Sequence, residues 1–262
     1  MYNKYIAIIT AENKERYISA TINSCLKQEI NNKLKIIVVY SNLKNEKTIK
    51  YKFKKYKNII FLKLLKKKKF PTQDQLYKIH CATKYINNEW IMLLDGDDKF
   101  KSKKIKFLSR LSLKKNQLYL HNHEIIHKNI MINYSNKFYK KFLIYKKLFN
   151  DWPEKVNTSS ILIPGNLLKN FYKKSKPYNW KYLAIDIQLV LFYFYKNKFK
   201  YIDEVLTEKV ENINNLDKKF SNYIKKIYWI RRMEQHKLTR SLSGKMNYLD
   251  RFISLFFQKI FK

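Results

Sequence analysis

Short runs of hydrophobic residues alternate with segments of helical periodicity over the first 100 residues. The runs at 5–10, 34–40, 58–62 and 90–94 are apolar and largely β-branched, which predicts strands buried on both faces. Between them, apolar side chains recur every three or four residues, the spacing of a helix with one buried face. This alternation predicts a mostly parallel α/β sheet flanked by helices, whose ligands bind beyond the carboxyl ends of the strands.

The second half of the chain has a more mixed pattern. We expect strands near 118–126, 158–163 and 199–202, a helix at 182–195 and a long basic helix at 216–237. There is no internal repeat and no linker rich in Gly, Ser or Pro. We therefore expect one α/β domain over residues 1–212, followed by a helical, basic C-terminal extension over 213–262.

The fourth predicted strand ends at an acidic cluster. Asp95, Asp97 and Asp98 follow it directly, and Gly96 lies between the first two. Carboxylates at this spacing can converge on one divalent cation, while a glycine lets a ligand approach the backbone. A hard cation bound there would bridge two phosphate oxygens. The alternative is an Asp-rich turn that caps the next helix.

Charge adds a further constraint. The 262 residues are 45% hydrophobic, which is too apolar for a disordered chain, yet 56 Lys and Arg against 20 Asp and Glu give a net charge of +36. Only six of these cations are Arg, and the abundance of Lys, Asn, Ile and Tyr with little Gly or Pro is typical of AT-rich coding sequence. Codon bias therefore explains much of the charge, and the remainder favours anionic partners.

The cysteines and the N-terminus bear on location. Cys25 and Cys81 have neither CxxC spacing nor the density of a disulfide scaffold, so we expect reduced thiols and a cytoplasmic protein. The N-terminal residues lack the pattern of a signal peptide. The weakly charged run at 183–195 is too short to span a bilayer.

Three segments together resemble the family 2 glycosyltransferases of the GT-A fold. They are IITAENKERYISATINSCLKQ at 8–28, the second strand IIVVYSN, and NNEWIMLLDGDD, which ends in the acidic cluster. The resemblance covers roughly residues 5–201 and weakens after residue 100. It implies a GT-A, Rossmann-like sheet and a metal-dependent transfer of sugar from a nucleotide-sugar donor.

The resemblance also implies roles for the acidic cluster. Asp95 and Asp97 match the family's DxD pair, so Asp97, helped by Asp98, would hold Mg²⁺ or Mn²⁺ on the donor diphosphate. Asp95 would contact the ribose or the metal.

Other positions match the family's donor-binding segments. They are Thr10, Asn13 and Glu15 in the nucleotide loop, Tyr40 at the end of the second strand, and Lys78, which could reach the donor phosphates. The family usually has an Asp that recognises uracil where Tyr40 or Ser41 stands here. UDP is therefore favoured as the donor nucleotide only by the family pattern, and nucleotide identity stays open.

The general base that the family uses begins a helix in the second half, and Asp186 is the best match. It is one carboxylate in an apolar run, where ionisation is costly without a purpose. The alternative is an Asp stabilised by the helix dipole. His236 could reach the diphosphate or the metal, as a C-terminal His does in some members, or could lie on an exposed helix.

His121 and His123 form an HxH pair on a predicted strand. Such a pair can bind zinc, but no third and fourth ligand follow at suitable spacing. Polar residues lining an acceptor cleft or the surface are the alternatives.

Two other functions compete with sugar transfer. The net charge suggests nucleic-acid binding, against which stand the acidic cluster and the scarcity of Arg. A nucleotidyltransferase of related α/β fold would want a Gly- and Arg-rich loop after the first strand, and TAENKER has no Gly. We therefore expect a nucleotide-sugar donor, a glycan or lipid-linked glycan acceptor in cell-surface polysaccharide synthesis, and no nucleic acid.

The last predicted helix, at 248–262, has an apolar stripe flanked by cations. The stripe consists of Leu249, Phe252, Ile253, Phe256 and Ile260. This pattern predicts a helix that lies on the inner face of the cytoplasmic membrane, where anionic headgroups attract Lys and Arg. The alternative is that the stripe docks on the catalytic domain or on a second subunit.

Overall fold

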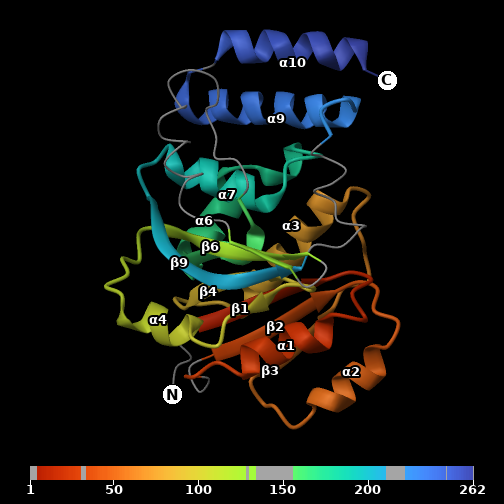
Figure 1. The fold of residues 1–262 in the computed structure, drawn as a ribbon, viewed down its shortest axis with the longest axis vertical. Helices are drawn as coiled ribbons and strands as arrows, with labels where there is room; N and C mark the ends of the chain where they lie inside the picture. Colours follow the sequence, from red (N-terminus) through yellow and green to blue (C-terminus); the bar gives the residue numbers. More distant parts are fainter. Residues whose placement is uncertain are drawn as a thin grey trace.

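Helices cover both faces of a mixed sheet (Figure 1). The computed structural model describes residues 5–30, 34–127, 130–133, 156–210, 222–245 and 247–261. Within them the strands are β1 (Tyr5–Ala11), β2 (Leu34–Tyr40), β3 (Ile59–Lys63), β4 (Trp90–Asp95), β5 (Lys99–Phe100), β6 (Leu118–His127), β7 (Ile130–Asn133), β8 (Ile161–Pro164) and β9 (Phe199–Val210). The α-helices are α1 (Ile18–Leu26), α2 (Glu46–Phe53), α3 (Pro71–Ala82), α4 (Lys104–Arg110), α6 (Gly165–Lys174), α7 (Ile185–Phe194), α9 (Lys226–Ser243) and α10 (Tyr248–Ile260).

The described strands form one sheet in the order β3-β2-β1-β4-β8-β6-β9-β5, with β7 paired to β6. The four strands from β3 to β4 are parallel, as the sequence predicts. Beyond them β8 is antiparallel to both β4 and β6. The carboxyl ends of β1 and β4 are neighbours, with Thr10 opposite Asp95, so the acidic cluster lies beside the loop that follows β1.

Alternate residues of β1 enter two different cores. Tyr5, Ala7 and Ile9 pack in a cluster with α1, α2 and α4. Ile6 and Ile8 pack on the other face with α3, α6 and α7. Because a strand presents successive side chains to opposite faces, an uninterrupted apolar run is what a strand covered on both sides requires.

Four elements differ by three residues or more from the expected boundaries. The helix expected at 182–195 begins at Ile185. The strand expected at 158–163 begins at Ile161, because a 3₁₀ turn, η2 (Thr158–Ser160), precedes it, with Asn157 Oδ1 accepting a hydrogen bond from the Ser159 amide. β9 extends beyond 202 to Val210, because it pairs with β6 along its whole length and its other edge pairs with β5 at Thr207 and Glu208. The basic helix is described from Lys226 to Ser243.

Residues 216–221 of the expected basic helix and the domain boundary predicted at 212/213 lie outside the described residues. Helix α9 packs against α7 and against the segment that precedes α7. Leu238 packs with Leu183, Ile187 and Leu191, and Glu234 accepts hydrogen bonds from the amides of 181–183.

We predict that Gly165→Ala lowers the free energy of unfolding by about 1–3 kcal/mol, the usual cost of overpacking. A Cβ at this first residue of α6 would lie 2.4 Å from Ile86 Cγ2 and 2.7 Å from the Asn87 carbonyl oxygen. Urea unfolding measures the change. Asn166→Ala, at the next and exposed position, is the control. Equal stability of the two variants would contradict the prediction.

Candidate active site

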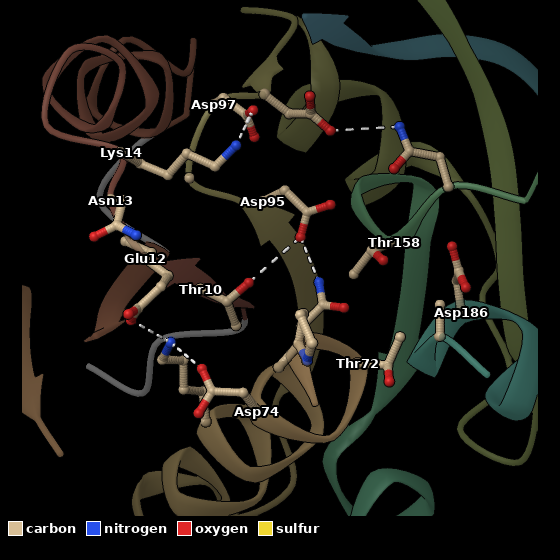
Figure 2. Close-up of a pocket in the computed structure, with 18 of the residues that line it drawn as sticks. Thr10, Glu12, Asn13, Lys14, Thr72, Asp74, Asp95, Asp97, Thr158 and Asp186 are labelled. Atoms are coloured by element: carbon tan, nitrogen blue, oxygen red, sulfur yellow. Dashed lines mark hydrogen bonds and ion pairs between the residues drawn. The ribbon is translucent and has the colours of Figure 1, made fainter. Parts of the chain in front are cut away.

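A cavity of about 520 Å³ opens at the carboxyl ends of β1 and β4. The loop after β1, the turn after β4, α3, η2, the start of α7, the end of β9 and α9 all contribute to its wall (Figure 2). Its polar lining includes Thr10, Glu12, Asn13, Lys14, Lys67, Thr72, Asp74, Gln75, Lys78, Asp95, Asp97, Asp98, Asn157, Thr158, Asp186, Lys209 and Arg231.

The turn after β4 is held against β1. The Gly96 amide donates a hydrogen bond to the Thr10 carbonyl at 2.9 Å, and Thr21 Oγ1 donates to the Gly96 carbonyl at 3.0 Å. A Cβ on Gly96 would lie 3.0 Å from the Thr10 carbonyl oxygen and 3.2 Å from Ala11. This close approach explains the glycine and fixes the direction of the carboxylates on either side of it.

Asp98 is buried and fully engaged with the protein. Its carboxylate accepts hydrogen bonds from Ser159 Oγ at 2.6 Å and from the Val210 amide at 3.1 Å. Burial, followed by the nearby charge of Asp97, raises the pKa of Asp98 to about 6. Asp98 therefore anchors the turn to η2 and to the end of β9.

Asp95 faces the cavity from the end of its strand. Its Oδ1 accepts from Gln75 Nε2 at 2.6 Å and from Thr10 Oγ1 at 3.3 Å. Burial and the charges of Asp98 and Asp97 raise its pKa well above the usual range. A cation in the cavity would relieve this concentration of negative charge.

Asp97 is paired with a lysine. Lys14 Nζ, from the loop after β1, donates to Asp97 Oδ2, and Figure 2 shows the two side chains extending toward each other. The lysine is about a third exposed, whereas Asp97 is buried. An ammonium group thus lies beside the carboxylate that matches the second Asp of the DxD pair.

The carboxylates after β4 fit a cation whose other ligands are substrate phosphates and water. Among the described residues, no group of three or more His, Cys, Asp or Glu side chains is arranged to hold a metal ion. Mg²⁺ in nucleotide sites is typically bound through one or two carboxylates, with substrate phosphates and water completing the octahedron. Asp97, with Asp95 beside it, matches that incomplete set, whereas Asp98 is committed to Ser159.

On the opposite wall, two acids and two lysines form a compact cluster. Lys78 is buried and donates to Asp74 Oδ2 at 2.5 Å and Glu12 Oε2 at 2.8 Å. Lys67 donates to the other oxygen of Glu12 at 2.6 Å. Burial alone would raise the pKa of Glu12, but the hydrogen bonds from these lysines lower it overall. Sequence reasoning chose Lys78 but missed Asp74, which belongs to no recognisable motif. It also missed Glu12, although Glu12 lies between the chosen residues Thr10 and Asn13.

The structure brings some of the predicted donor residues together and not others. Thr10, Asn13, Lys78 and Asp95 line the cavity. Asn13 adopts a left-handed conformation with φ of 52°, and its amide donates to the Asn42 carbonyl.

Glu15 and Tyr40 are not among the cavity-lining residues. Glu15 accepts a hydrogen bond from the Lys44 amide at 2.9 Å, which lowers its pKa. The Tyr40 ring is buried, and its hydroxyl donates to Glu46 at 2.9 Å. Both side chains support the loop that follows β2.

Asp186 lines the cavity from the first turn of α7. Its side chain is 8% exposed, and its Oδ1 accepts a hydrogen bond from the Ile187 amide at 2.7 Å. Figure 2 shows Asp186 across the cavity from Glu12 and Asn13, with Asp95 between them. The position at the helix start agrees with the family pattern and equally with a favourable helix dipole.

His236 lies outside the cavity lining, buried between α9 and α10. Its Nε2 is 3.6 Å from Asp250 Oδ2. The basic residues that α9 and β9 bring to the cavity are instead Arg231 and Lys209. Sequence reasoning chose the right helix, but the side of α9 that carries His236 does not face the cavity. Which side faces it depends on how α9 packs against α7 and α10.

His121 and His123, the HxH pair, are buried and lie within hydrogen-bonding distance of protein groups. His123 Nδ1 contacts Ser160 Oγ at 3.2 Å, and His121 Nδ1 lies 2.8 Å from the Asn122 carbonyl. Burial, with Lys104 nearby, lowers the pKa of His121 well below its usual range. No described Cys, Asp or Glu joins the pair in a metal-binding group.

Comparison with solved structures identifies the architecture. One similar structure is residues 1–349 of S. aureus TarS in complex with UDP-GlcNAc, with a TM-score of 0.65, 13% identity and coverage of 98% of this chain and 71% of that one. Another is the mannosyltransferase PcManGT from Pyrobaculum calidifontis in complex with GDP-Man and Mn²⁺, with a TM-score of 0.61, 10% identity and coverage of 99% and 70%. Both are glycosyltransferase structures of the GT-A type.

The chain has the GT-A fold. This confirms the fold class predicted from the three N-terminal segments. Neither a scan of protein-family models nor a search of curated proteins gives a match. The GT-A sheet places the DGDD turn at the cavity by its strand order, since β4 lies directly beside β1.

The raised pKa of Asp98 predicts a pH dependence of stability. Between pH 3.8, its ordinary pKa, and about 6, the folded state holds a proton that the unfolded state has released. The free energy of unfolding should therefore fall as pH rises through this interval, and Asp98→Asn should make that fall smaller. Urea unfolding at pH 4 to 7 in EDTA measures both slopes. Asp203→Asn, at an exposed position, is the control, and identical slopes for Asp98→Asn and wild type would refute the assignment.

Proposed function

We propose that this protein is a metal-dependent glycosyltransferase. It transfers a sugar from a nucleotide-sugar donor to a hydroxyl of a glycan or lipid-linked glycan, with inversion, in cell-surface polysaccharide synthesis. One observation supports this most directly. The carboxylates after β4 and Asp186 at the start of α7 line the same cavity of a GT-A fold.

The diphosphate of the donor belongs beside Asp97. A Mn²⁺ or Mg²⁺ ion held by Asp97 and Asp95 would neutralise the diphosphate as it leaves, which is the chemistry that such an ion supplies. In that state Lys14 would give up its bond to Asp97 and would pair with a phosphate oxygen. Lys209 and Arg231 add positive charge from the other wall of the cavity. These groups bind the leaving group and stabilise its developing charge.

The nucleoside belongs toward the loop after β1. Thr10, Asn13 and Asp95 line that part of the cavity and offer hydroxyl, amide and carboxylate groups, while the ammonium group of Lys78 is bonded to Glu12 and Asp74. The resemblance to family 2 favours a UDP-sugar. The two similar structures were solved with UDP-GlcNAc and with GDP-Man, so this fold accommodates both a pyrimidine and a purine donor.

Asp186 is proposed as the general base. An acceptor hydroxyl beside it would transfer its proton to the carboxylate as the oxygen attacks the anomeric carbon, and the bond to the nucleoside diphosphate breaks on the opposite face. The buried carboxylate is held by the Ile187 amide, which fixes its orientation. Attack on the face opposite the breaking bond would invert the anomeric carbon.

The proposed location is the cytoplasm, at the inner face of the membrane. Cys25 and Cys81 are free thiols, which agrees with a reducing compartment. None of the described helices is long and apolar enough to cross a bilayer. A nucleotidyltransferase or nucleic-acid-binding function finds less support, since the cavity presents carboxylates and the similar structures are glycosyltransferases.

Asp97→Asn should abolish metal-dependent binding of a nucleoside diphosphate while the melting temperature stays within a few degrees of wild type. The substitution removes the charge that a divalent cation needs, and the carboxylate contributes nothing to the hydrophobic core. Calorimetry with UDP, GDP, CDP and dTDP, each with and without Mn²⁺, checks the result and identifies the nucleotide. Asp203→Asn should bind as wild type does. Unchanged binding by Asp97→Asn would remove the proposed donor site.

Asp186→Asn should retain donor affinity but transfer sugar about 10²-fold more slowly or worse, the usual scale for loss of a general base. The measurements are calorimetric donor affinity and the single-turnover transfer rate, with the acceptor found by screening glycans and lipid-linked glycans. If transfer continues near the wild-type rate, another residue is the base. If donor affinity falls with the rate, Asp186 acts in binding instead.

A further inference from the structure

The last helix, α10, turns buried polar side chains toward the protein and exposes apolar ones. The side of α10 that faces α9 includes Asp250 and Ser254, both buried, and Arg232 of α9 binds both oxygens of Asp250 at 2.7 Å. Phe257 of α10 also lies on this side, and its ring stacks on that of Trp229 in α9, with 4.7 Å between the ring centroids.

The outer side of α10 is apolar and uncovered. Its large hydrophobic side chains are between 38% and 76% exposed, and none of them belongs to a described core cluster. They are Tyr248, Leu249, Phe252, Leu255, Phe256 and Ile260, which we call the outer face of α10. In Figure 1 this helix is the outermost layer, beyond α9. The stripe seen in the sequence therefore does not dock on the catalytic domain.

We propose that the outer face of α10 docks on an anionic lipid bilayer. Three aromatic rings and three aliphatic side chains on a short helix form the apolar side of an interfacial helix. Lys259 is the one charged residue among the exposed positions of α10, and a lysine stem can lie along acyl chains while its ammonium group reaches the headgroups.

Charge complementarity selects the bilayer over other occupants. The chain bears +36, and exposed cations stand at Lys245, three residues before α10, and at Lys225 and Lys226, where α9, the helix packed on α10, begins. A negative surface attracts such a molecule over a Debye length before the apolar side chains make contact.

A second copy of the chain fits this face less well. Face-to-face pairing of two such helices would bring two molecules of high positive charge together, and like charges in close contact repel. An anionic bilayer avoids this cost.

Co-sedimentation of the full chain with vesicles tests the proposal. The vesicles are phosphatidylglycerol with phosphatidylcholine in equal parts, or phosphatidylcholine alone, at physiological salt. Wild type should sediment with the anionic vesicles. Phe252→Ser/Phe256→Ser should partition about 10-fold more weakly or worse, because two exposed rings no longer enter the acyl boundary. Circular dichroism checks that α10 stays folded, as exposed positions predict.

The matched control is Tyr51→Ser/Leu65→Ser, which removes two exposed apolar side chains elsewhere and should bind as wild type does. Equal partition of the Phe252/Phe256 variant and wild type would overturn the proposal, since charge alone would then explain binding. Absence of wild-type binding would also overturn it. So would a wild-type dimer in sedimentation velocity that the Phe252/Phe256 variant abolishes. None of these outcomes depends on sugar transfer.

Discussion

One serine hydroxyl holds the acidic turn in place. Ser159 Oγ donates to the Asp98 carboxylate at 2.6 Å and accepts from the Asp95 amide at 3.0 Å, so it joins both ends of the turn to η2. Beneath it, the Ser159 carbonyl accepts from Lys104 Nζ at 3.2 Å and from Thr207 Oγ1 at 3.0 Å. A buried lysine is tolerated there because it is hydrogen-bonded and lies 3.6 Å from the ring centroid of Phe100.

That anchoring determines which carboxylates are available for chemistry. Because the Asp98 carboxylate is held by Ser159 Oγ and the Val210 amide, Asp97 and Asp95 are the carboxylates that we expect to meet a cation in the cavity. Gly96 lets them approach β1, where Lys14 supplies a positive charge. The unfavourable concentration of three acids is thus divided among separate partners. The cavity keeps acidic and basic groups within reach of one ligand, the mixture that a metal-bound diphosphate would use.

The sequence predicted the N-terminal half of the fold well, because buried parallel strands and one-faced helices have strong periodic patterns. The DGDD turn and Asp186 could be found for the same reason, since each stands out against an apolar run. Asp74, Lys209 and Arg231 could not be found, since tertiary packing alone brings them to the cavity. Glu12 could have been found, because it lies in the predicted nucleotide loop between Thr10 and Asn13. His236 shows the limit most clearly. Its helix was expected, but the rotation of that helix depends on Arg232 and Asp250, whose pairing no local pattern predicts.

Helix α9 contacts both the cavity and α10, through neighbouring residues. Arg231 lines the cavity, whereas the next residue, Arg232, holds α10 through Asp250. A small rotation of α9 would therefore move both contacts at once. If the cavity and the outer face of α10 are coupled in this way, linkage requires the effect to be reciprocal. A ligand that changes the affinity of α10 for its partner by some factor must have its own affinity changed by that same factor when the partner binds.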